Sequence, residues 1–102
     1  MMSERSEGNA ITAVRLEMMR RGASKADIDH ADDCLHRLGM KLAAHPPDLA
    51  GAAPARRQLA EWVVVAQDYV GEDFMQFQMA RASLTERVEG LARASWLSAR
   101  GR

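Results

Sequence analysis

The polar side chains best suited to chemistry lie close together in one short segment of the chain. They are Asp29, His30, Asp32, Asp33, Cys34 and His36. Residues four apart share one face of a helix, so His30 and Cys34 would present an imidazole and a thiol side by side. Two such ligands can begin a zinc site, but a complete site needs a third or fourth ligand.

The rest of the sequence supplies no pattern that completes such a site. The only other histidine is His45, and there is no His-Glu-x-x-His, Cys-x-x-Cys or Glu-x-x-His motif. We therefore predict no metal site and no cofactor. The segment is interpreted instead as a solvated acidic face, with Cys34 packed beside Ile28 and Leu35.

Enzymatic activity is also not predicted. A nucleophilic Cys34 would need a base and a third group that orients it, and the neighbouring acids would raise the pKa of the thiol. The glycines are scattered singly, so no phosphate-binding loop is expected. An enzyme would require a cleft that joins His30, Cys34 and His45.

The bulk properties indicate one domain without a membrane span. The chain has 102 residues, zero formal net charge and a single cysteine. No apolar run approaches the length of about 18 residues that a membrane helix requires. The first ten residues are polar, so we expect no signal peptide and a cytoplasmic location.

Helical signals dominate the first half of the chain. We expect a disordered tail over residues 1–8 and a single helical domain over 9–102. A first helix over 9–21 would be capped by Asn9 and ended by Gly22. Ser24 would then cap a second helix over 25–44, with Asp27 three residues later.

The second half carries the strongest pattern. After a proline-containing linker over 45–54, we expect helices over 55–82 and 84–99, with a break near Ala82–Ser83; one continuous helix is the alternative. Gly71 is a possible kink. Apolar residues recur at steps of three and four, which is typical of a helix face. They are Leu59, Trp62, Val63, Ala66, Tyr69, Val70, Phe74, Phe77, Ala80, Leu84, Val88 and Leu91.

A second apolar side is also present in this half, through Val65, Tyr69, Met75 and Met79. A helix that is apolar around much of its circumference is buried on several sides. We therefore predict an all-α fold, a small three- to four-helix bundle with a long C-terminal helical half, completed by dimerisation.

The function predicted from these features is a non-enzymatic protein–protein interaction module. Such an adaptor, chaperone or small inhibitor, of the kind that phages or plasmids encode, would dock a helical surface onto a partner protein. Aromatic, Met and Arg side chains are enriched at the centres of interfaces. The candidate contact residues are Tyr69, Phe74, Met75, Phe77 and Met79, with Arg81 and Arg87 at the rim. Each apolar member of this set has ordinary core packing as its alternative.

A nucleic-acid-binding regulator is the alternative function. Residues 81–102 contain five arginines against two glutamates, and arginines can follow a phosphate backbone. The candidate residues are Arg81, Arg87, Arg93, Arg100 and Arg102. The acidic start of the second helix would place carboxylates where a recognition helix needs basic or amide groups.

Overall fold

Four helices form the part of the chain that the computed structural model describes, residues 4–44 and 52–100. They are α1 (Glu4–Arg20), α2 (Lys25–Ala43), α3 (Ala52–Val70) and α4 (Met75–Arg100). These two ranges contain no strand, so the predicted all-α fold is confirmed. None of the helices in these ranges combines the length and apolar character that crossing a membrane requires.

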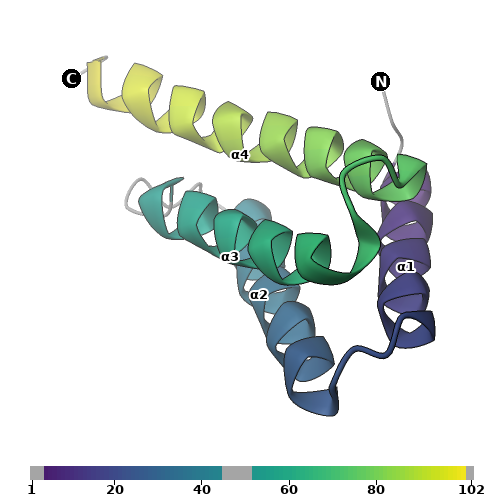
Figure 1. The fold of residues 1–102 in the computed structure, drawn as a ribbon. Coiled ribbons are helices and arrows are strands. Elements are labelled where there is room, and N and C mark those ends of the chain that lie inside the picture. The colour runs from purple at the N-terminus through teal and green to yellow at the C-terminus, as the bar shows by residue number, and fades with distance from the viewer. Residues whose placement is uncertain (1–3, 45–51, 101–102) are drawn as a thin grey trace.

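The helices pack as two layers that cross (Figure 1). In this view α3 runs from left to right and α4 returns above it in the opposite direction, while α2 passes behind α3 and α1 descends at the right. The most extensive packing joins α2 with α3, and α4 lies against both α1 and α3. The bundle is elongated, with principal extents of 50 × 28 × 19 Å.

One apolar core joins all four helices. Trp62 of α3 and Phe77 of α4 lie at its centre, with ring centroids 5.7 Å apart and planes tilted by 40°. Val14 and Met18 of α1 and Leu38 of α2 close around them, each about 1% exposed. Every member of the apolar series predicted for the second half is either buried in this core or packed against it. The helical periodicity of Leu59 to Leu91 is thus confirmed.

The turn between α1 and α2 follows the predicted local signals. Gly22 has φ of +86°, the left-handed conformation that glycine adopts most readily after a helix. Ser24 then caps α2, because its hydroxyl accepts a hydrogen bond of 3.1 Å from the backbone N–H of Asp27. The predicted cap is confirmed, and α2 ends at Ala43, one residue before the predicted end.

The start of the first helix differs from the expectation. The helix begins at Glu4, so Asn9 lies inside it and caps nothing, and residues 4–8 are not a disordered tail. Residues 1–3 of the predicted tail lie outside the described ranges. The reason is tertiary: Glu7 is buried, at 6% exposure, against residues of α4.

The break in the second half is also placed differently. The chain leaves the helix at Gly71, which has φ of +75°, and α4 begins at Met75, so the predicted break near Ala82–Ser83 is wrong. The predicted helices over 55–82 and 84–99 are replaced by α3 and α4. Of the predicted linker over 45–54, residues 45–51 lie outside the described ranges and 52–54 belong to α3, with Pro54 in the first turn.

Candidate functional site

The predicted docking residues divide into buried and exposed members. Phe77 exposes none of its surface and packs against Trp62, so it belongs to the core and is not presented to a partner. Phe74 is half-buried against the same core. Tyr69 is half-buried too, and its hydroxyl donates a hydrogen bond to the carboxylate of Asp27 on α2. These three side chains hold the helices together.

Met75 and Met79 are placed in the opposite way. Their exposed fractions are 64% and 41%. The buried residues of α4, such as Ala80 and Leu84, follow the helical repeat along one side, and Met75 and Met79 lie on the side facing away from it. Six residues on the side of α4 that faces away from the core are all exposed. We call Met75, Met79, Ala82, Glu86, Arg93 and Leu97 the outer face of α4.

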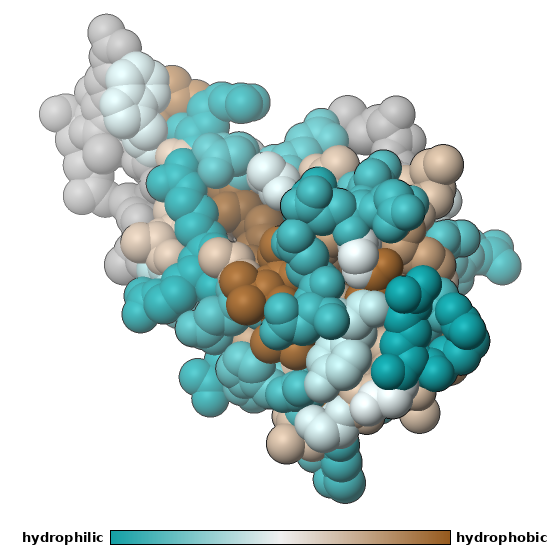
Figure 2. All heavy atoms as spheres, viewed as in Figure 1, coloured by the Kyte–Doolittle hydropathy of each residue, from teal (hydrophilic) through white to brown (hydrophobic). Residues whose placement is uncertain are grey.

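Other large apolar side chains are exposed elsewhere on the molecule. They are Leu16, Met19, Met40, Val64 and Trp96. Figure 2 shows one face of the molecule, where hydrophobic spheres gather over α3 and the space toward α4 and hydrophilic residues surround them. Apolar surface is therefore present on several helices. On α4 it consists of Met75, Met79 and Leu97, on the side opposite the buried residues of that helix.

Among the described side chains of the alternative site, those of Arg81 and Arg87 contact other residues of the chain. The guanidinium of Arg81 lies over the ring of Phe77, 5.3 Å from its centroid. Arg87 donates a hydrogen bond of 2.5 Å to the buried carboxylate of Glu7, which also accepts one from Ser83. Ser83 therefore ties α4 to α1 and does not start a new helix.

The remaining arginines are placed differently from these two. Arg93 is exposed on the outer face of α4. Arg100 is the last residue of α4, and its side chain is not described. Arg102 lies outside the described ranges. The hydrogen bond from Arg56 and, to a smaller extent, the charge of Arg93 lower the pKa of Glu89 on α4, so Arg93 is exposed but lies near a carboxylate of its own helix.

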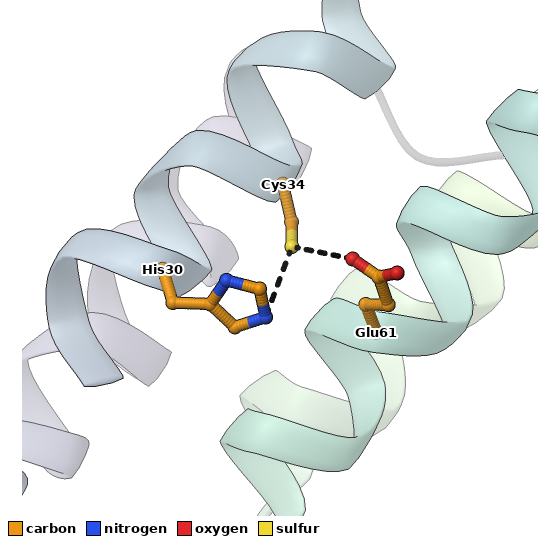
Figure 3. A group of neighbouring side chains, drawn as sticks. All are labelled: His30, Cys34 and Glu61. Carbon is orange, nitrogen blue, oxygen red and sulfur yellow. Dashed lines mark hydrogen bonds between the residues drawn. The ribbon is translucent and has the colours of Figure 1, made fainter. Parts of the chain in front are cut away.

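A cluster of three potential metal ligands lies between α2 and α3 (Figure 3). The Sγ of Cys34 is 3.8 Å from Nε2 of His30 and 3.6 Å from Oε2 of Glu61, and the three ligand atoms all lie within 4.8 Å of one another. His30 and Cys34 are the pair expected from their spacing. Glu61 was not predicted, because it is 27 residues from Cys34 in sequence. The third histidine, His45, lies outside the described ranges.

The environment of Cys34 disfavours the thiolate. The side chain is about 1% exposed, and the pKa of the thiol is raised to about 11, with burial as the largest single cause. The hydrogen bond that the thiol donates to the carboxylate of Glu61, and the negative charge of that carboxylate, contribute to the same increase. The predicted direction is correct, although the largest single cause is burial rather than a neighbouring acid. At neutral pH Cys34 is protonated, which does not suit a nucleophile.

Comparison of the chain with protein-family models, curated proteins and solved structures finds no match.

Proposed function

We propose that this chain is a non-enzymatic protein–protein interaction module that docks the outer face of α4 onto a partner protein. Adaptors, chaperones and small inhibitors act in this way. The observation that supports the proposal is the exposure of Met75 and Met79 on the side of α4 opposite its buried residues. A helix that is apolar on two opposite sides is suited to burial on both.

The chemistry of this face fits the recognition of a helix by a groove. Met75 and Met79 are four residues apart, so they lie one above the other and can enter a single apolar groove. Methionine is flexible and polarizable, which allows it to adapt to an irregular surface. Glu86 and Arg93 follow on the same face and provide a charged rim that excludes wrong partners.

Self-association is part of the proposal. In a two-fold symmetric dimer each contact occurs twice: if one residue of the first copy contacts another residue of the second copy, the same pair is formed with the copies exchanged. Glu86 and Arg93 lie seven residues apart on the outer face, so two antiparallel copies of α4 can form two equivalent ion pairs between them. In this register the pairing is centred between Glu86 and Arg93, and Met79 lies opposite position 100 of the second copy, so the methionines lie at the edge of the paired region.

The first test is a pull-down of the tagged full chain from its native host, with nuclease treatment, followed by mass spectrometry. The same experiment is run with the double variant Met75→Glu/Met79→Glu, since a carboxylate in an apolar groove is costly. The matched control is Leu16→Glu on α1, another apolar residue that is 58% exposed. Static light scattering of the three purified proteins reports the oligomeric state.

We expect one protein to be retained by the wild type and the control after nuclease treatment, and to be lost from the double variant by about tenfold or more, corresponding to 1.4 kcal/mol. If that protein is a second copy, light scattering will show a dimer that the double variant converts to a monomer. Equal retention by all three proteins would contradict the proposal. Retention that disappears on nuclease treatment would favour the nucleic-acid alternative.

A further inference from the structure

We infer that α2 and α3 together form a zinc-binding site, with Nε2 of His30, Sγ of Cys34 and a carboxylate oxygen of Glu61 as its protein ligands. The inference is independent of the proposed docking function, because the three residues lie on α2 and α3 and the outer face lies on α4. It rests on the geometry of the cluster, on the chemical nature of its ligands and on access from the surface.

The spacing of the ligand atoms agrees with tetrahedral zinc. Zinc lies about 2.3 Å from a thiolate sulfur and about 2.0–2.2 Å from imidazole nitrogen or carboxylate oxygen, which sets two ligands about 3.5 Å apart at the tetrahedral angle. The sulfur of Cys34 is 3.8 Å from the nitrogen of His30 and 3.6 Å from the oxygen of Glu61. The nitrogen of His30 and the oxygen of Glu61 lie within 4.8 Å of each other, so these two side chains must approach each other to bind one ion.

Rigid elements hold these atoms in place. His30 and Cys34 lie on adjacent turns of α2, and Glu61 approaches from α3, the helix against which α2 packs most extensively. Figure 3 shows the imidazole of His30 and the carboxylate of Glu61 on either side of the Cys34 sulfur. Cys34 is fixed by its burial, whereas His30 is exposed and can turn toward an incoming ion.

The ligand types select the metal. Thiolate and imidazole together favour zinc over magnesium and calcium, which prefer oxygen ligands. A thiolate and a carboxylate carry two negative charges, which one Zn²⁺ neutralises. When zinc binds, the S–H bond of Cys34 breaks, the sulfur donates its electron pair to the metal, and the proton passes to solvent.

Access to the cluster is provided by a shallow groove between α2 and α3. The groove has a volume of about 290 Å³, and His30 and Glu61 line it together with Arg57, Ala60, Val64 and Val65. His30 and Glu61 can therefore be reached from the surface, whereas Cys34 is buried and does not line the groove. Three protein ligands leave one position of a tetrahedral zinc site open, which a water molecule would fill.

The test is a titration of the reduced, chelator-treated full chain with Co²⁺ under anaerobic conditions, followed by addition of Zn²⁺. Cobalt reports its ligands spectroscopically: a sulfur-to-cobalt charge-transfer band shows thiolate coordination, and intense visible bands show tetrahedral geometry. We expect both signals to saturate at one equivalent of Co²⁺ and to disappear when Zn²⁺ displaces it. Absence of the charge-transfer band would overturn the inference.

Variants identify the ligands. Cys34→Ser should remove the charge-transfer band. His30→Ala and Glu61→Gln should each weaken Zn²⁺ binding by at least about 10–100-fold, which is the effect of losing a residue that only hydrogen-bonds to a ligand. The matched control is His36→Ala, an exposed histidine on α2 outside the cluster, which should leave binding unchanged. Circular dichroism confirms that each variant is helical. If His30→Ala binds Zn²⁺ as tightly as the wild type does, or if only His36→Ala weakens Zn²⁺ binding, the ion binds outside this cluster and the inference is overturned.

Discussion

Replacement of Phe77 by alanine is expected to lower the free energy of unfolding by about 3–5 kcal/mol, the largest effect of any single substitution considered for this chain. Phe77 is completely buried, its ring packs against Trp62, and the guanidinium of Arg81 lies over it. Alanine would lose these contacts and leave a cavity that four helices surround. A domain of this size is stable by about 5–15 kcal/mol, so the loss is a large share of the total.

Urea unfolding followed by circular dichroism measures this effect, with Met79→Ala as the matched control. Met79 lies two residues away on the same helix and is 41% exposed, so its replacement should change the free energy by no more than about 0.5 kcal/mol. The pair separates a core residue from a surface residue among the predicted docking residues. Similar free-energy changes for the two variants would show that Phe77 is not in the core.

Replacement of Arg87 by alanine is expected to lower the free energy of unfolding by about 1–3 kcal/mol. Glu7 is 6% exposed, and Arg87 and Ser83 both donate hydrogen bonds to its carboxylate. Without Arg87 this carboxylate loses its cation while it stays buried. The side chain of Arg87 is 40% exposed, so water screens the pair and the cost is lower than that of breaking a fully buried ion pair.

The matched control for Arg87→Ala is Arg93→Ala, the loss of an exposed arginine from the same helix, which should change stability by no more than about 0.5 kcal/mol. Adding Glu7→Gln to Arg87→Ala should recover part of the loss, because it removes the buried charge. Equal midpoints for Arg87→Ala and Arg93→Ala in urea would contradict the structural role given to the Glu7–Arg87 pair.

The sequence predicted the features of the fold that depend on neighbouring residues. Gly22 and Ser24 mark the end of α1 and the start of α2, because a left-handed glycine and a capping hydroxyl act within one helical turn. The helix predicted from the apolar spacing is present even at Val63, Val64 and Val65, whose β-branched side chains favour strands. Tertiary packing outweighed that preference, as the burial of Trp62 and Ala66 beside them shows.

The features that were missed depend on contacts between distant residues. Glu7 was assigned to a disordered tail because its partners, Ser83 and Arg87, are 76 and 80 residues away. The same contact explains why the predicted helix break near Ala82–Ser83 was wrong. Ser83 resembles a helix cap in sequence, but it lies within α4 and its hydroxyl donates a hydrogen bond to Glu7. Gly71 was interpreted as a possible kink, whereas the helix ends there and α4 packs back on α3.

The candidate sites show the same division. The spacing of His30 and Cys34 indicated two adjacent ligands, but Glu61 approaches from another helix and no local pattern indicates it. Among the predicted docking residues, the sequence could not separate Phe77 from Met79, because both belong to apolar series with helical spacing. The direction of the core, which only the packed bundle defines, places one inside and the other on the outer face of α4.

The most direct test of the docking function is site-specific photo-crosslinking in the native host, with a photoreactive amino acid at position 79 or, as control, at position 16. Both positions are exposed, Met79 on the outer face of α4 and Leu16 on α1. The proposal predicts a discrete crosslinked protein species from position 79 and none from position 16. No crosslinked species at position 79, or the same species at both positions, would contradict the assignment of the outer face of α4 as the docking surface.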